Sequence, residues 1–348
     1  MLDYLKNYVL EGGYKVGGKS GEALKNALHD KAFLTWVNAY AEYMPDFNEK
    51  LTETLMNMSA SRNDDLEIFR KGLIPILCAE KLELLQSRLE KAVLMPFEKY
   101  VKRARKYLPK GTRIRVDVYI TVDPFNWGMM RPGKILLSIV QDEPTEESLK
   151  GLAHEFHHAG AFYWLSRNQK LNALKSSNEH AYMLAEVFTY FVTEGLANWY
   201  FSPWTTRTIE GDEEHNRVIK KLEKKMPWLI KATEQLLKWI YERHEPIEDI
   251  KALFKSISVD TSGRGIPAGH FLSGRMVGMM DDSNVINKEE IIELVKYPFD
   301  FFDLYNKVAA ESGKLNVALL EKIKNKIEEW STTSASNHLK SFSTSKAN

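Results

Sequence analysis

The chain has 348 residues, of which 44% are apolar and 27% charged, so it can bury a substantial core as one large domain or two ordinary ones. Its 48 basic and 47 acidic residues nearly cancel, which gives no electrostatic reason to expect nucleic acid or an anionic membrane as a partner. The single cysteine, Cys78, excludes an internal disulfide and any zinc site built mainly from cysteine. A bound metal would therefore need histidine and carboxylate ligands.

The N-terminal segment, MLDYLKNYVLEGGYKVGG, carries acidic and basic residues within its first seven positions. It lacks the apolar run and the small-residue cleavage site of a signal peptide. No uncharged apolar run of about 18 residues occurs anywhere in the chain, so no membrane-spanning helix is expected. We therefore expect a soluble, cytoplasmic protein.

Residues 21–108 repeat apolar side chains every three or four positions, which is the period of amphipathic helices. Three helical segments are predicted, at 21–44, 46–58 and 79–108, and the last should kink or break at Pro96. We interpret this region as a helical scaffold.

The period changes at residue 112, where alternating side chains over 112–122 predict a half-buried strand. Residues 123–133 are rich in glycine and proline and predict a turn. Residues 134–140 predict a second strand. These are the only convincing strand signals, and they directly precede a cluster of histidines.

Helical periodicity resumes after this segment. A first helix is predicted from an N-cap at Thr145 to about Ser166, and a second from about Ser177 to just before Pro203. Further helices are predicted from 210 to about 330, interrupted by a glycine-containing loop at 258–269.

The histidine cluster lies in GLAHEFHHAG, residues 151–160, and contains an H-E-x-x-H pattern. On a helix, His154 and His158 share one face about 5–6 Å apart, so both imidazoles can reach one zinc ion. Glu155 is rotated by about 100° and can take a proton from a metal-activated water without being a ligand. The pattern does not require His157. Such a cluster would be costly to bury on this otherwise apolar helix without a partner such as a metal.

A catalytic zinc needs a third protein ligand. Trp164 occupies the position at which the metzincin pattern requires a histidine, so that pattern is excluded. The helix predicted after it, AYMLAEVFTYFVTEGLANWYF, offers Glu186 and Glu194. Glu194 lies in the more apolar stripe, where a carboxylate should have a positive partner, and it is the better candidate.

The segments HEFHH and TEGLANWY together resemble the gluzincin metallopeptidases, whose second active-site helix carries an E-G-[apolar]-A segment. The resemblance implies an α+β, mainly helical fold with a gluzincin-like core, a small sheet and active-site helices. It also implies one zinc ion per chain, held by His154, His158 and Glu194, with Glu155 as general base. Asn198 lies where such enzymes often place a group that orients a ligand histidine.

Two features distinguish the chain from the aminopeptidase branch. The interval between His158 and Glu194 is 35 residues long and contains a polar segment, 167–180, which we interpret as a loop. The G-x-M-E-N segment that grips a substrate amino terminus is absent, since 126–134 carries no acid. The resemblance is closer to a group of bacterial and archaeal zinc-dependent peptidases with a mostly helical body, and it covers roughly 110–310.

His270 lies at the start of a predicted helix after the glycine-containing loop. Either His270 or a tyrosine that the sequence does not identify is the candidate donor to the oxyanion of a tetrahedral intermediate, although an exposed or packed histidine would give the same pattern at 270. Arg275 is a substrate-anchoring or a surface residue, and Tyr190 a core residue. The basic run at 220–225 is expected to be a solvated helix face.

We predict a helical N-terminal region at 1–110, a zincin-like catalytic core at 111–330 and a disordered Ser/Thr-rich tail at 331–348. The predicted function is zinc-dependent hydrolysis of a peptide or protein substrate, aligned by the strand at 134–140 or its neighbour. The alternatives are a non-catalytic helical zinc-binding or scaffold protein, and a zinc hydrolase of a non-peptide bond.

Overall fold

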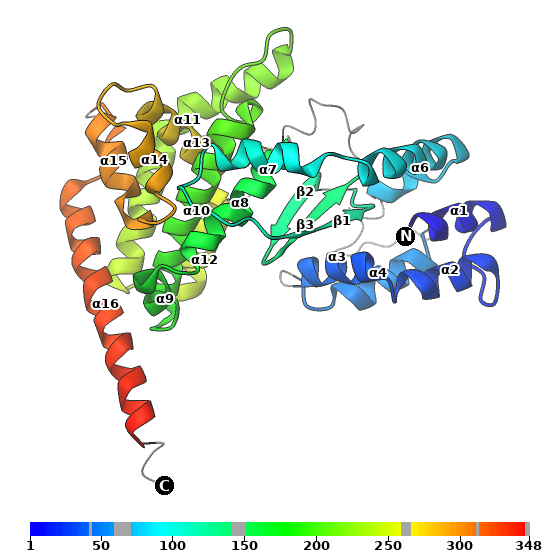
Figure 1. Cartoon of the computed structure of the whole chain (residues 1–348), viewed down its shortest axis with the longest axis horizontal. Coiled ribbons are helices and arrows are strands. Elements are labelled where there is room, and N and C mark those ends of the chain that lie inside the picture. Colours follow the sequence, from blue (N-terminus) through cyan, green and yellow to red (C-terminus); the bar gives the residue numbers. More distant parts are fainter. Residues whose placement is uncertain are drawn as a thin grey trace. The chain divides into compact units, whose positions relative to one another are not determined.

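Figure 1 shows the computed structural model of the chain, which describes residues 1–41, 44–58, 71–124, 126–140, 151–258, 266–310 and 313–344, with side chains as far as residue 332. The fold is mainly helical with a small three-stranded sheet, as predicted. The chain packs as two compact units. The first contains Met1–Tyr100 and Arg115–Glu155, and the second contains Val101–Ile114 and Phe156–Asn348.

This division differs from the boundary predicted at residue 110. The strands belong to the first unit, whose core includes Leu136 and contacts from Tyr119 and Met129. The short segment 101–114 belongs to the second unit because Leu108 and Ile114 pack into its core.

The first unit contains the helices predicted for its N-terminal region, together with a helix at Leu2–Glu11, where the predicted helical region of 1–110 had no individual helix assigned. They are α1 (Leu2–Glu11), α2 (Lys19–Ala27), α3 (Lys31–Ala41), α4 (Phe47–Met56), the 3₁₀ turn η1 (Ile74–Ile76) and α6 (Ala79–Val93). Helix α7 (Phe97–Arg105) begins after Pro96, so the predicted break is confirmed. The pattern over 21–44 forms two helices because Asp30 interrupts it and accepts a hydrogen bond from the amide of Phe33.

The sheet has the order β1–β3–β2, with β1 (Asp117–Thr121), β2 (Gly128–Arg131) and β3 (Lys134–Ser138). Strand β3 is central, parallel to β1 and antiparallel to β2. The segment predicted as a turn therefore contains an edge strand. Its short sequence has no alternation, but Pro132 and Gly133, whose φ is +73°, form a tight turn that folds it back onto β3.

Helix α8 (Leu152–Leu165) begins at the end of the first unit and continues as a single helix into the second. The N-cap predicted at Thr145 lies outside the described residues. The second predicted helix is α10 (Glu179–Phe201), and Asn178 caps it by accepting from the amide of Ala181. Between them, the segment interpreted as a loop contains α9 (Gln169–Lys175), capped in the same way by Asn168.

The rest of the second unit is helical, as predicted. Its elements are η3 (Pro203–Thr205), α11 (Glu213–Glu242), α12 (Ile247–Ser258), α13 (Ala268–Asp281), α14 (Lys288–Glu293), η4 (Pro298–Asp300), α15 (Phe301–Val308) and α16 (Val317–Thr344). The loop predicted at 258–269 lies mostly outside the described residues. We predicted a disordered tail from residue 331, but helix α16 continues to Thr344. Extending a helix that already exists costs less free energy than starting a new one, so polar residues can continue it.

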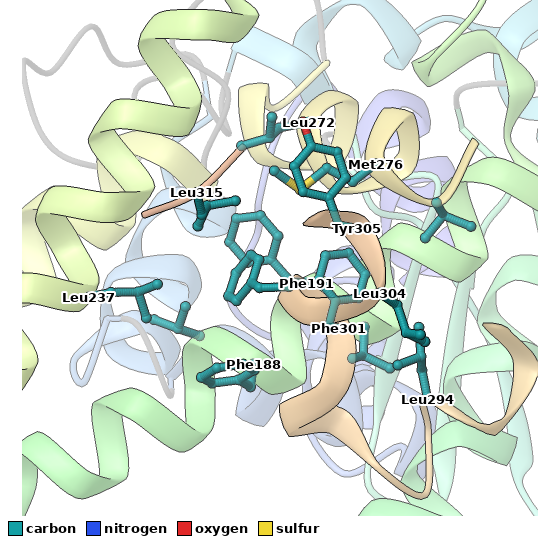
Figure 2. Packing of buried hydrophobic residues seen from close by; sticks show 14 of the residues in the cluster. Phe188, Phe191, Leu237, Leu272, Met276, Leu294, Phe301, Leu304, Tyr305 and Leu315 are labelled. Atoms are coloured by element: carbon teal, nitrogen blue, oxygen red, sulfur yellow. The ribbon is translucent and has the colours of Figure 1, made fainter. Parts of the chain in front are cut away.

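The core of the second unit surrounds α10, which is buried on almost every side. Figure 2 shows aromatic side chains of α10 and α15 meeting apolar side chains of α11 and α13 in this core. The labelled residues are Phe188, Phe191, Leu237, Leu272, Met276, Leu294, Phe301, Leu304, Tyr305 and Leu315. None of the helices in the described part of the chain is both long enough and apolar enough to cross a membrane.

Helices α10 and α13 approach each other closely because of glycines at their contact. A Cβ added to Gly195 would lie 2.9 Å from Cγ2 of Val277 and 3.0 Å from the carbonyl oxygen of Ser273. A Cβ added to Gly274 would lie 3.3 Å from Cβ of Asn198. This close packing fixes how the first turn of α13 faces Glu194 on α10.

Candidate metal centre and active site

The structure brings together the three predicted metal ligands. Ligand atoms of His154, His158 and Glu194 all lie within 4.8 Å of one another. The two histidines are one turn apart on α8, as the H-E-x-x-H pattern predicts, and both are buried. Two imidazoles and one carboxylate form a donor set of the kind that binds zinc.

Glu194 lies between two imidazoles. Its Oε1 is 3.3 Å from Nε2 of His158, and its Oε2 is 3.4 Å from Nε2 of His270. Burial raises the pKa of Glu194 to about 7, and a hydrogen bond from Asn198 partly opposes that rise. A cation beside this carboxylate would stabilise its charged form.

Asn198 lies one turn after Glu194 and is fully buried. Its Nδ2 donates to Oε2 of Glu194 at 3.0 Å and to the carbonyl oxygen of Glu194 at 2.8 Å. We expected Asn198 to orient a ligand histidine. In the structure its amide instead holds the carboxylate of Glu194, because on a helix residues four apart are neighbours.

The other candidate glutamate lies elsewhere on α10. Glu186 forms an ion pair with Nζ of Lys175 at 2.7 Å, and both side chains are about one-third exposed. Glu194, and not Glu186, is therefore the glutamate that the fold brings to the two histidines.

Glu155 is buried against the first residue of β2. A Cβ added to Gly128 would lie 3.3 Å from both Cγ and Oε1 of Glu155. The carboxylate therefore occupies the space that a side chain at position 128 would need. Gly128 was missed at the sequence level because its strand was not predicted.

His157 lies apart from the metal cluster. It is fully buried, with Nε2 3.1 Å from the carbonyl oxygen of Tyr107 and its ring 5.4 Å from that of Phe201. Burial lowers its pKa to about 4, so the ring is neutral at pH 7. These contacts fit the prediction that the H-E-x-x-H pattern does not use His157.

His270 lies in the first turn of α13, and its side chain is 27% exposed. Burial lowers its pKa to about 4, so it presents a neutral imidazole beside Glu194. Tyr190 packs near it, with ring centroids 5.9 Å apart, and donates its hydroxyl to the carbonyl oxygen of Ser258 at 3.2 Å. Burial, with a smaller contribution from Glu194, raises the pKa of Tyr190 well above its ordinary value.

The remaining sequence candidates have contacts away from the cluster. Nη2 of Arg275 is 4.0 Å from Oε1 of Glu223 on α11, which favours its interpretation as a surface residue. The basic run at 220–225 is exposed except for Leu222, so its interpretation as a solvated helix face is confirmed.

Comparison with known proteins gives a family for the chain. No curated protein and no solved structure matches it. Residues 77–314, more than half of the chain and including every member of the cluster, match the family described as "Putative zinc dependent peptidase (DUF5700)". The chain belongs to this family of zinc-dependent peptidases.

Proposed function

We propose that the chain is a metallopeptidase of the gluzincin type, with one zinc ion held by His154, His158 and Glu194 and with Glu155 as general base. The observation that carries the proposal is the convergence of three ligand atoms within 4.8 Å on helices that also carry an adjacent buried acid. The family supports zinc dependence and peptide hydrolysis at a coarser level.

The donor set fits a catalytic zinc better than a structural one. Catalytic sites use three protein ligands and keep one position for water or substrate, whereas structural sites are closed by four ligands, often cysteines. Burial of Glu194 also favours a cation at this place, because an isolated carboxylate would be costly there.

Zinc bound to these residues would polarise the scissile carbonyl and make a water more acidic. Glu155 follows His154 on α8 and would accept a proton from the attacking water at its carboxylate. The protonated carboxyl would then deliver that proton to the nitrogen of the leaving amine. Packing against Gly128 restricts where this carboxylate can lie.

His270 is the residue we assign to the oxyanion. Its half-buried imidazole lies beside Glu194 and can donate an N–H bond to a developing negative charge. Tyr190 is the less suitable donor, because its hydroxyl is bonded to the carbonyl oxygen of Ser258.

The substrate would align along β2. Strand β3, the first candidate for this role, is paired on both sides, so the role passes to its neighbour. Because the carbonyl oxygen of Trp127 accepts from the amide of Ser138 at 2.9 Å, the N–H and C=O of the next residue, Gly128, point away from β3. An extended peptide can pair with that edge beside Glu155. The carbonyl of Met130 accepts from Arg131, so the pairing would be short.

Metal content and peptide cleavage test the proposal together. Purified wild type should contain one zinc per chain, and His158→Ala and Glu194→Gln should lose it. Glu186→Gln is the matched control on α10 and should keep its zinc. Glu155→Gln should keep its zinc and lose peptide cleavage by about 10²–10⁴-fold, the usual contribution of a general base.

The opposite results identify the alternatives. Zinc kept in Glu194→Gln and lost in Glu186→Gln would refute the third ligand. Zinc binding with no hydrolytic activity above background, in wild type as in Glu155→Gln, would indicate a non-catalytic zinc protein. Cleavage of esters or other bonds, with no peptide cleaved, would indicate a different zinc hydrolase.

A further inference from the structure

Helix α3 lies outside the residues that match the family, yet it is hydrogen-bonded to the segment 123–131, which leads into β2 and includes that strand. Asp123, which is 3% exposed, lies at the start of this segment. Its Oδ2 accepts from Nε1 of Trp36 at 3.0 Å and from the hydroxyl of Tyr40 at 2.7 Å, both on α3. Its Oδ1 accepts from the backbone amide of Asn126 at 3.1 Å.

The same helix is bonded to the far end of the segment. Nη2 of Arg131, the last residue of β2, donates to the carbonyl oxygen of Ala39 at 3.0 Å. In addition, Nδ2 of Asn126 donates to the hydroxyl of Tyr40. Helix α3 therefore contacts residues both before β2 and at its end.

The middle of the segment packs against the start of α8. A Cβ added to Gly151, just before α8, would lie 3.1 Å from ring atoms of Trp127. Gly128 follows Trp127, and a Cβ added to it would lie 3.3 Å from Cγ and Oε1 of Glu155. The segment thus lies between α3 and the turn of α8 that carries Glu155, within the first unit.

The chemistry of this network suggests a role beyond stability. A carboxylate buried at the level of Asp123 costs free energy, and the donors on Trp36, Tyr40 and Asn126 do little more than compensate for that cost. Apolar side chains of similar volume would stabilise the unit about as well. Hydrogen bonds depend on direction, so these bonds also restrict the backbone of the segment to one position, which apolar contacts would not do.

We propose that Trp36 and Tyr40 are positioning residues, which act through Asp123 to hold Gly128 at a fixed place against the carboxylate of Glu155. The consequence for turnover rests on the proposed function, in which Glu155 is the general base. Misplacement of a catalytic group by about 1 Å can cost up to 10²-fold in rate, so the network should be visible in kcat.

Hydrogen exchange tests the structural part on full-length, zinc-loaded protein. Tyr40→Phe and Asp123→Asn each remove or weaken a bond to the segment, and Trp36→Phe serves as a second α3 variant. Amide exchange in a peptide covering 126–131 should accelerate about fivefold or more, as the loss of one hydrogen bond implies. Tyr119→Phe is the control, because its hydroxyl is bonded to Asp117 on β1 and to Lys31 on α3, so it removes a contact of α3 that does not involve Trp36, Tyr40 or Asp123.

Peptide cleavage by the same variants tests the catalytic part. Tyr40→Phe should lower kcat about tenfold, with KM within about twofold, unchanged zinc content and a melting temperature close to that of Tyr119→Phe. Unchanged exchange over 126–131 would overturn the proposal. Faster exchange with an unchanged kcat would overturn it too, provided that Glu155→Gln is inactive. If Glu155→Gln is as active as wild type, the proposed function has failed instead, and exchange alone decides whether α3 holds Gly128.

Discussion

The two glutamates of the candidate site are held in place by different kinds of structure. Glu194 lies on a buried helix whose contact with α13 is made close by Gly195, and the amide of Asn198 fixes its carboxylate. Glu155 lies against a short edge strand that hydrogen bonds from α3 hold in position. The difference predicts different responses to substitution. Changes at the α10–α13 contact should cost folding stability, whereas changes around Gly128 should cost turnover.

Among the substitutions that compare the two sides of the site, the largest effect is expected at His270, which the α10–α13 contact brings beside Glu194. His270→Ala should lower kcat by about 10²–10³-fold, as the loss of one oxyanion donor does elsewhere, with a smaller change in KM. Zinc content should not change if His270 is a donor and not a ligand. Steady-state kinetics and metal analysis check both points.

Arg275→Ala is the matched control, since Arg275 lies on the same helix and contacts Glu223. It should retain wild-type kcat. A kcat of His270→Ala within twofold of wild type would exclude the oxyanion role, and loss of zinc in that variant would make His270 a ligand.

The position of His270 differs from that of the two histidines on α8 in how well the sequence predicts it. Helical periods and the spacing of His154 and His158 are local properties, so the sequence predicted them and the structure confirms the helices. The proximity of His270 to Glu194 depends on how α10 and α13 pack, across 76 residues of chain, and no local pattern encodes it.

The surroundings of Glu155 were the least predictable part of the site, because they too depend on contacts between residues far apart in the chain. Residues 128–131 have neither alternation nor β-branched side chains, and they form a strand because a tight turn folds them onto β3. The bond from Trp36 to Asp123 spans 87 residues and joins a helix to a loop. A buried aspartate beside a proline gives only a turn signal in the sequence.

An intermediate effect is expected from closing the α10–α13 contact. Gly195→Ala gains up to about 1 kcal/mol in helix propensity. The added Cβ, however, would lie 2.9 Å from Val277 and 3.0 Å from the carbonyl oxygen of Ser273. Overpacking of this kind typically costs about 1–3 kcal/mol, so we expect a net loss of stability in urea unfolding.

A double-mutant cycle identifies the cause of that loss. Val277→Ala removes the Cγ2 that the new methyl group meets. The double variant should therefore lose less free energy of unfolding than the sum of the losses in the two single variants. Strict additivity of the two substitutions would mean that the contact with Val277 does not limit the approach of the helices.

The smallest effect, and the sharpest test of the comparison, is expected at Gly128. An added Cβ would lie 3.3 Å from Cγ and Oε1 of Glu155, so the carboxylate must move by a few tenths of an ångström. Gly128→Ala should therefore lower kcat about tenfold while the free energy of unfolding changes by less than about 1 kcal/mol. Gly313→Ala is the matched control, because its Cβ would make an ordinary contact at 3.4 Å with the hydroxyl of Tyr305. If Gly128→Ala instead loses stability and keeps its kcat, as Gly195→Ala should, then the edge strand is packed like the helical core and the two sides of the site do not differ.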